Sequence, residues 1–281
     1  MSSSGFLEAN DLWFAYDDSR PVLRGISLAV SRGDFVAILG QNGSGKTTFA
    51  KHFNGLLRPT RGQILLDGSD IHDRPIGELA RTVGYVFQNP DQQIFSATVF
   101  DEVAFGPRNL GFDDLRVQHQ VQEALALFGL ESFANHSPAT LGFGLRRKVT
   151  LAAVYSMQTP ILILDEPSTG LDWQSTVSLM DLLTTLHREG RTILLITHDM
   201  RIVADYIPHS IVLNDGKLVA HEATRSLFQQ TERLARTNLE PPQVTRLAKK
   251  LESCGMPNDI LTVNEFCDRY VHLLAPDNKP A

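Results

Sequence analysis

One short segment restricts the possible folds of this chain more than any other. Residues 40–47 read Gly-Gln-Asn-Gly-Ser-Gly-Lys-Thr and fit the pattern G-x-x-x-x-G-K-[ST]. Glycines let the backbone turn so that its N–H groups point inward at phosphate oxygens, and a following helix adds the positive end of its dipole. An apolar run at residues 35–39 precedes the segment and a helical pattern over residues 46–56 follows it, which is the context this chemistry requires.

The segment predicts a site for nucleotide phosphates with defined side-chain roles. Lys46 is expected to reach the β- and γ-phosphates, and the Thr47 hydroxyl is expected to bind Mg²⁺. A plain Gly-rich turn would not explain why lysine and threonine follow the third glycine. The other residues expected to contact the nucleotide are Gly40, Asn42, Gly43, Ser44, Gly45 and Thr48.

Two carboxylates follow a second apolar run, at residues 161–164. Open α/β sheets bind ligands at the carboxyl ends of their strands, so Asp165 is expected to hold Mg²⁺ and Glu166 to polarise the attacking water. His198 follows the apolar run at 192–197 and is expected near the γ-phosphate. The simpler alternative is that the two acids are solvated surface residues, but this alternative does not account for the predicted phosphate site in the same chain.

The rest of the chain predicts an α/β fold, because strand and helix patterns alternate. Residues 98–157 are helical in pattern, which predicts a helical insertion between strands. After about residue 231 the pattern changes to short helices, with a capping box expected at 262–265. The expected strands are residues 6–16, 22–30, 35–39, 64–66, 83–87, 161–164, 192–197 and 211–213, with a hairpin turn at 214–216.

Composition narrows the function classes. The 281 residues carry a formal net charge of −6, with both signs spread along the chain. Nucleic-acid binders usually show a basic surplus, so no nucleic-acid partner is expected. No apolar run approaches the roughly 18–20 residues that span a bilayer, and we expect neither a membrane span nor a signal peptide.

Taken together, these elements resemble the ATP-binding cassette (ABC) family over about residues 7–227. The resemblance implies ATP and Mg²⁺ as cofactors and a P-loop NTPase fold with a RecA-like core and an antiparallel β subdomain. It also implies an α-helical subdomain at about residues 90–157, within an ATP-binding domain of residues 1–230. Residues 231–281 would form a small helical extension, for which dimerisation is one expected role.

The same resemblance implies roles for further residues. Tyr16 matches the aromatic residue that stacks on adenine, and Gln88 matches the glutamine that contacts Mg²⁺ and senses the helical subdomain. Glu166 matches the catalytic glutamate and His198 the switch histidine. Residues 168–172, Ser-Thr-Gly-Leu-Asp, look like the loop that crosses the dimer interface.

A narrower resemblance links residues 88–99 and 102–107 to the energy-coupling-factor importers of vitamins or of cobalt and nickel ions. It implies a second ATPase subunit, a transmembrane subunit and a separate substrate-binding membrane subunit, at the cytoplasmic face of the cell membrane. Ile94 and Phe95 give this segment an apolar surface near Gln88, where the family receives coupling helices of the transmembrane subunit. The sequence does not name the substrate, since specificity in this group resides in the membrane subunit.

One motif departs from the family pattern. The family sequence Leu-Ser-Gly-Gly-Gln is here Leu141-Gly142-Phe143-Gly144-Leu145. The family serine donates to the γ-phosphate bound by the opposite subunit, and Gly142 has no hydroxyl. Losing one charge-assisted hydrogen bond costs about 1.5–3 kcal/mol. Gly142, Phe143 and Gly144 would still serve the partner's site through the helix N-terminus.

Several alternatives stay open from the sequence. The chain forms either a homodimer that tolerates the altered motif or a heterodimer with an ATPase whose motif is intact, with a slight preference for a homodimer or a close paralogue. A weakly hydrolysing or regulatory subunit is favoured by the altered motif and disfavoured by Glu166. A soluble ABC ATPase of translation or DNA maintenance is disfavoured, because such proteins join two cassettes or insert long coiled coils.

Overall fold

The core is a mostly parallel sheet with apolar residues on both faces. The computed structural model describes residues 5–17 and 20–274, and within them the larger sheet has the order β10-β9-β3-β8-β7-β6. Strands β3, β8, β7, β6 and β9 pair in parallel, and β10 pairs antiparallel with β9. The strands are β3 (Phe35–Leu39), β6 (Val83–Val86), β7 (Ile161–Asp165), β8 (Thr192–Ile196), β9 (His209–Asn214) and β10 (Lys217–Ala223).

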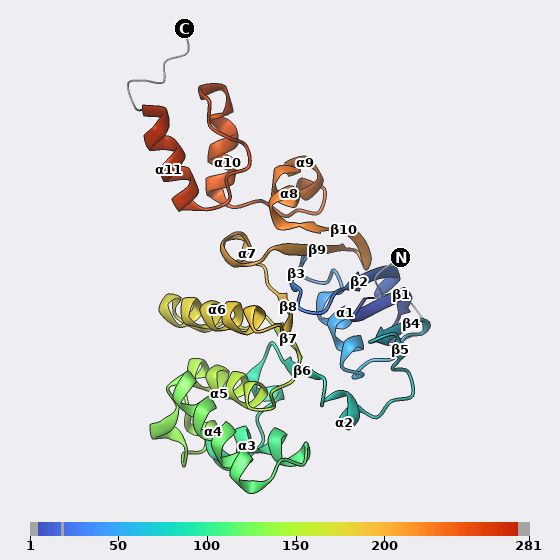
Figure 1. Cartoon of the computed structure of the whole chain (residues 1–281). Coiled ribbons are helices and arrows are strands. Elements are labelled where there is room, and N and C mark those ends of the chain that lie inside the picture. The colour runs from blue at the N-terminus through green and yellow to red at the C-terminus, as the bar shows by residue number, and fades with distance from the viewer. Residues whose placement is uncertain (1–4, 18–19, 275–281) are drawn as a thin grey trace.

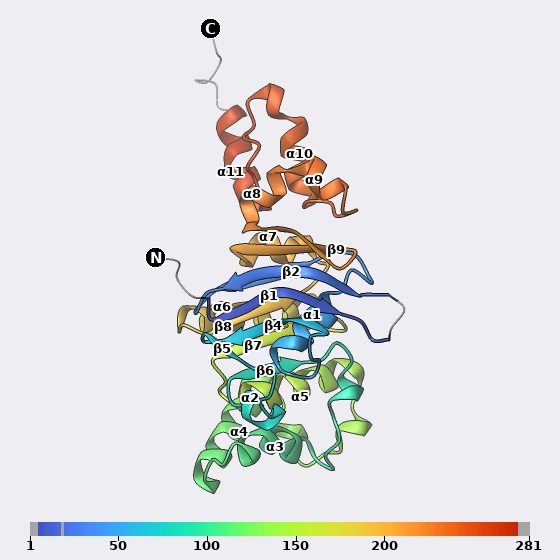
Figure 2. The same cartoon turned by 90° about the vertical axis from the view of Figure 1, so that its right-hand side faces the viewer.

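A smaller antiparallel sheet lies beside this core. Its order is β2-β1-β4-β5, and Figure 2 shows its strands in front of the larger sheet. Leu7 of β1 is paired with Val30 of β2 and with Leu66 of β4, so β1 is the shared central strand. The strands are β1 (Leu7–Phe14), β2 (Leu23–Val30), β4 (Arg61–Leu66) and β5 (Ser69–Asp70).

Strand alternation divides the apolar side chains into two layers. Val36 and Ile38 of β3 pack with α1 (Lys46–Phe53) and with the antiparallel sheet. Phe35 and Leu39 point to the opposite face and pack with α6 (Trp173–Arg188) and α7 (Met200–Tyr206). Successive side chains of a strand face opposite ways, so a strand covered on both faces must be apolar throughout, as β3 is.

Three helices lie between β6 and β7 and form a separate cluster at one end of the molecule (Figure 1). They are α3 (Val99–Asn109), α4 (Asp114–Phe128) and α5 (Phe143–Tyr155). Side chains fix where the first two begin, because Thr98 accepts from the Asp101 N–H at 3.1 Å and Asp113 accepts from the Arg116 N–H at 2.9 Å. The short helix α2 (Ile76–Leu79) precedes β6.

The C-terminal helices stand at the opposite end of the molecule (Figure 1). They are α8 (Thr224–Gln229), α9 (Thr231–Ala235), α10 (Gln243–Lys250) and α11 (Val263–Leu274). Ala248, Met256 and Ile260 form a small buried cluster of their own. The expected capping box is present, since the Glu265 N–H donates to Thr262 Oγ1 at 3.1 Å and the Thr262 N–H donates to the Glu265 carboxylate at 3.4 Å.

The predicted α/β fold is confirmed, and some element ends are corrected. The helix expected over residues 46–56 ends at Phe53, because Gly55 has φ +74° and leaves the helical conformation. The strand expected over residues 6–16 ends at Phe14, where pairing with β2 stops. Across residues 5–17 and 20–274, no helix is long and apolar enough to cross a membrane.

Candidate functional site

The phosphate loop connects β3 to α1 and depends on glycine conformations. Gly40, Gly43 and Gly45 have φ values of +152°, +80° and +98°. A Cβ on Gly40 would lie 2.3 Å from the Leu213 carbonyl oxygen, so only glycine fits where the loop leaves the strand. Ser44 is buried in this turn, and no described group is a partner of its Oγ.

Lys46 lies folded across the loop. Its Nζ donates to the carbonyl oxygens of Gly40 at 2.8 Å and of Gln41 at 2.9 Å. Burial lowers the pKa of Lys46, while the charges of Glu166 and Asp165 raise it. The ammonium group is therefore held between the loop backbone and two carboxylates, which suits it to bind an anionic ligand placed there.

Asp165 is the best-placed metal ligand among the predicted residues. The Thr47 hydroxyl donates to Asp165 Oδ2 at 2.7 Å and the Tyr85 hydroxyl donates to the same atom at 3.3 Å. Asp165 Oδ1 is buried, and no described group hydrogen-bonds to it. Burial raises the pKa of Asp165, and the two hydroxyl donors lower it. A carboxylate, a hydroxyl and an orphaned carboxylate oxygen in one place fit Mg²⁺, which prefers oxygen ligands.

Glu166 follows in a strained backbone position. Its φ is +48°, an uncommon value for a residue with a side chain, and such strain clusters at functional sites. Its N–H donates to the Ile196 carbonyl at 2.9 Å, which ties the residue to the end of β8. His198 Nδ1 lies 2.9 Å from Glu166 Oε1, and the His198 side chain is 74% exposed.

Two predicted residues stand at the edges of the site. Tyr16 is 63% exposed, its hydroxyl is 3.1 Å from Thr48 Oγ1, and the Phe14 ring packs edge-to-face against it at 4.8 Å. An exposed ring held this way can accept a base on its free face. Gln88 follows β6 and lines the cavity that the phosphate loop forms.

A cavity of about 340 Å³ brings most of the predicted residues together. Gly40 and Ser44 are buried within the loop and do not line the cavity, and neither does Tyr16. His198 contacts Glu166 but lines a separate, wider cavity beside α7. The predicted residues that line the site are Asn42, Gly43, Gly45, Lys46, Thr47, Thr48, Gln88, Asp165 and Glu166.

The altered motif lies elsewhere, at the N-terminus of α5. Gly142 is the N-cap, and it is followed by Phe143 and Gly144. None of the three lines the cavity. Phe143 packs on Gly170, because a Cβ on Gly170 would lie 2.3 Å from Phe143 Cδ1. The motif therefore lies outside the cavity that the phosphate loop lines.

Sequence reasoning missed two residues at the site. Tyr85 donates to Asp165 from within β6, where a lone hydroxyl in an apolar strand was the available signal. Arg147 is fully buried and donates to the carbonyl oxygens of Phe87 and Gln88. Its signal was weak, since a helix start commonly carries several charged residues.

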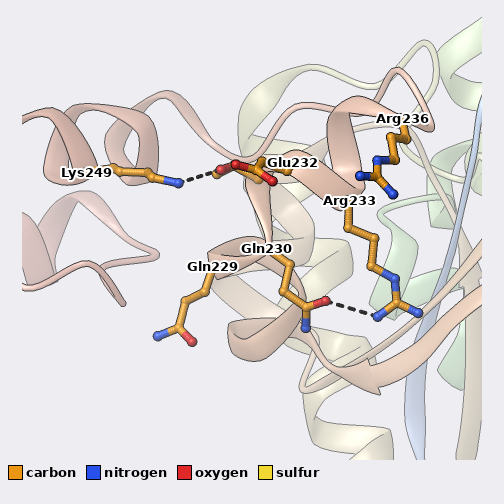
Figure 3. Close-up of a pocket in the computed structure, with 7 residues that line it drawn as sticks. Gln229, Gln230, Glu232, Arg233, Arg236 and Lys249 are labelled. Carbon is orange, nitrogen blue, oxygen red and sulfur yellow. Dashed lines mark hydrogen bonds between the residues drawn. The ribbon is translucent and has the colours of Figure 1, made fainter.

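Two further cavities lie beside the C-terminal helices and away from the phosphate loop. One, of about 920 Å³, is lined by residues of α7 and by residues 241–244 and 261–264. The other, of about 480 Å³, is lined by side chains around α9 (Figure 3), where Arg233 donates to the Gln230 Oε1 at 3.0 Å. The larger one also includes His198 and three residues of the capping box at 262–265, whereas the smaller one is lined by no residue that the sequence singled out.

Comparison with known proteins gives consistent matches. The profile of the family described as ABC transporter matches residues 23–169, slightly more than half of the chain. The energy-coupling factor transporter ATP-binding protein EcfA of Methanothermobacter thermautotrophicus is 38% identical over 274 residues, which cover 96% of this chain and 88% of that protein. An ABC transporter ATP-binding protein of Caldanaerobacter subterraneus is 42% identical over 87% of this chain, which spans 43% of that relative's length.

Solved structures agree with these matches. The structure of cbiO1 from Clostridium perfringens, described as part of the ABC transporter complex cbiONQ, has a TM-score of 0.73 at 35% identity and covers 88% of this chain and 100% of that one. A dimeric ATP-binding cassette in a post-hydrolysis state with ADP and Pi has a TM-score of 0.71 at 26% identity. That match covers 78% of this chain and 98% of the other.

Proposed function

The chain belongs to the ABC transporter family, and from this premise we propose that it is the ATPase subunit of an energy-coupling-factor-type importer. The predicted family, the P-loop NTPase fold and the ATPase class are confirmed. The observation that carries the proposal is the cavity in which Lys46, Gln88, Asp165 and Glu166 meet. The match to EcfA over nearly the whole chain, including the C-terminal helices, favours the importer group.

In the proposed reaction, the phosphate loop binds the triphosphate, Asp165 helps to hold Mg²⁺ and Glu166 activates the attacking water. Tyr16 stacks on the adenine, while the loop N–H groups and Lys46 bind the β- and γ-phosphates. Lys46 exchanges its carbonyl acceptors at Gly40 and Gln41 for phosphate oxygens. Glu166 orients the attacking water and accepts its proton, and the neighbouring His198 donates to the γ-phosphate as charge redistributes.

Thr47, Asp165 and Gln88 are the residues that would hold Mg²⁺. When bound, the ion neutralises charge on the phosphates. Asp165 supplies its orphaned Oδ1, and Tyr85 keeps the carboxylate oriented through Oδ2. Burial raises the pKa of Asp165, and a bound cation would offset this by stabilising the ionised carboxylate.

We propose that two ATPase subunits close head-to-tail around two nucleotides. Gly142, Phe143 and Gly144 of each subunit would then reach the partner's γ-phosphate through the N-terminus of α5. This arrangement explains why the three residues stand outside the chain's own cavity. A homodimer and a heterodimer with a paralogue both fit, and the extension of residues 231–281 offers additional surface for dimerisation.

The proposed membrane partner docks on the aromatic surface beside Gln88. Phe95 is 64% exposed and packs edge-to-face on exposed Phe105 at 4.6 Å. Buried Glu102 accepts from the N–H groups of Phe95 and Ser96 at 3.1 and 2.8 Å, so the loop that presents Phe95 is fixed. We propose a transmembrane subunit there, at the cytoplasmic face of the membrane, with a metal ion such as cobalt or nickel, or a vitamin, as cargo of a separate membrane subunit.

Co-purification tests this proposal. The tagged chain, isolated from detergent-solubilised membranes of its source cells, is expected to retain an integral membrane protein in fixed stoichiometry. Phe95→Asp should lose that protein, because a charge would be buried in the interface. Leu115→Asp is the matched control, since Leu115 is an exposed apolar residue of α4 outside the aromatic pair. No membrane protein with the wild-type chain, or equal retention by Phe95→Asp, would contradict the proposal.

A further inference from the structure

Arg147 is a buried charge for which the proposed reaction has no role. It lies on α5 with no solvent exposure. Its Nη1 donates to the Phe87 carbonyl at 2.6 Å and its Nη2 donates to the Gln88 carbonyl, while Nε is buried without a described partner. Burying a guanidinium against neutral carbonyls costs free energy, so we expect Arg147 to have a specific role.

The two carbonyls stand on either side of one residue. The Phe87 carbonyl belongs to the peptide plane before the Gln88 Cα, and the Gln88 carbonyl belongs to the plane after it. Because peptide units are planar, holding both planes restrains the φ and ψ of Gln88 and therefore the direction of its Cα–Cβ bond, from which the side chain extends. Arginine suits this task, since its rigid fork offers donors on two nitrogens, whereas lysine is a single point.

The charges of Asp165 and Glu166 also favour the position of the Arg147 guanidinium. Burial lowers the pKa of Arg147, and attraction to Asp165 and Glu166 raises it. The guanidinium therefore offsets part of the negative charge at the end of β7 while it holds the Gln88 backbone. The neighbouring Gln93 adds a further restraint, because its Oε1 accepts from the Phe87 N–H at 3.2 Å.

Phe143 connects this arrangement to the loop at residues 168–172. Phe143 and Arg147 are four residues apart on α5 and so share a face, and the Arg147 Cζ lies 5.9 Å from the Phe143 ring centroid. The same ring also contacts Gly170, and a Cβ on Gly144 would lie 3.1 Å from the Gly170 carbonyl oxygen. A continuous path of contacts therefore runs from Gly170 through Phe143 and Arg147 to Gln88.

We propose that Arg147 is a positioning residue that orients Gln88 toward the Mg²⁺ site. We also propose that Phe143 makes this orientation depend on the loop at 168–172. The phenylalanine that breaks the family motif thus has a task within its own subunit. The inference rests on the proposed function, because it assigns Gln88 to the cation. It predicts that loss of Arg147 weakens the contribution of Mg²⁺ to nucleotide binding rather than nucleotide binding itself.

The test compares the affinity for AMP-PNP in excess Mg²⁺ with that in EDTA, by calorimetry on the full chain. We expect Arg147→Gln and Arg147→Lys to bind AMP-PNP in EDTA as tightly as the wild type does. The factor by which Mg²⁺ raises their affinity should be about tenfold smaller than in the wild type. Arg146→Gln is the matched control and should keep it. Arg146 lies beside Arg147 on α5 but pairs with Asp91 at 3.1 Å and with the Leu141 carbonyl at 3.1 Å.

A double-mutant cycle tests the path through the ring. Phe143→Ala should reduce the Mg²⁺ enhancement in the wild-type background and have no further effect in Arg147→Gln. An unchanged enhancement in folded Arg147→Gln, or fully additive losses, would overturn the proposal. Should Arg147→Gln fail to fold, Arg147→Lys still decides, since it keeps a positive charge there but offers one donor nitrogen instead of the fork. A wild-type chain that binds no AMP-PNP would instead refute the proposed function.

Discussion

The contact between Phe143 and Gly170 gives a sharp prediction for Gly170→Ala. Gly170 has φ +80°, and alanine in this left-handed conformation costs about 1–2 kcal/mol. Its Cβ would also lie 2.3 and 2.4 Å from two carbon atoms of the Phe143 ring. The ring is partly exposed and can swing out, which sacrifices its contact with Arg147, worth about 0.5–1 kcal/mol. The free energy of unfolding should therefore fall by about 1.5–3 kcal/mol.

Urea unfolding followed by circular dichroism measures this change in two backgrounds. In the wild-type chain Gly170→Ala carries the backbone strain and the displaced ring. In Phe143→Ala the ring is already absent, and Gly170→Ala should cost only the backbone strain of about 1–2 kcal/mol. The two backgrounds should thus differ by about 1 kcal/mol. An equal cost in both would show that Phe143 does not pack on Gly170, and would refute the reasoning.

Three other predictions concern the nucleotide site. Asp165→Asn should abolish hydrolysis yet raise the midpoint of thermal unfolding at neutral pH. The folded-state pKa of Asp165 lies above its ordinary 3.8, so ionisation of Asp165 lowers the stability of the wild type as the pH rises from 3.8 through the folded pKa. The stability gained by Asp165→Asn should therefore vanish below pH 3.8. His198→Gln should lower turnover at least tenfold but change stability by no more than about 1 kcal/mol, since the His198 side chain that contacts Glu166 is 74% exposed; equal losses of both would contradict this. Gly142→Ser should raise turnover by about tenfold if the chain works as a homodimer, because nothing lies within 4 Å of the new Cβ and the hydroxyl restores one donor to phosphate.

Much of the fold follows from local sequence patterns, and the departures have physical causes. The apolar runs at residues 35–39 and 161–164 predicted buried strands because strands covered on both faces need apolar residues throughout. Helix α1 ends three residues before the end of its helical pattern, because Gly55 adopts a left-handed conformation. The pairing of β1 with both β2 and β4 depends on long-range contacts that no local pattern encodes.

The site shows the same division between local and tertiary information. The phosphate loop was predictable because its chemistry fixes residue types at fixed spacing along the chain. The Tyr85 and Arg147 contacts were not, since each joins segments that the topology brings together. The contact between Phe143 and Gly170 of the same chain likewise became visible only in the structure. The sequence had already shown that Phe143 departs from the family motif.

ATP turnover of the purified chain, measured beside Glu166→Gln and together with its oligomeric state in ATP, tests whether this chain is an ATPase that works as a dimer. We expect hydrolysis that requires Mg²⁺, that Glu166→Gln abolishes, and that accompanies a nucleotide-dependent dimer. Glu166→Gln should still bind ATP and accumulate as the closed dimer. Turnover that survives in Glu166→Gln, or a chain that binds no ATP, would contradict the account.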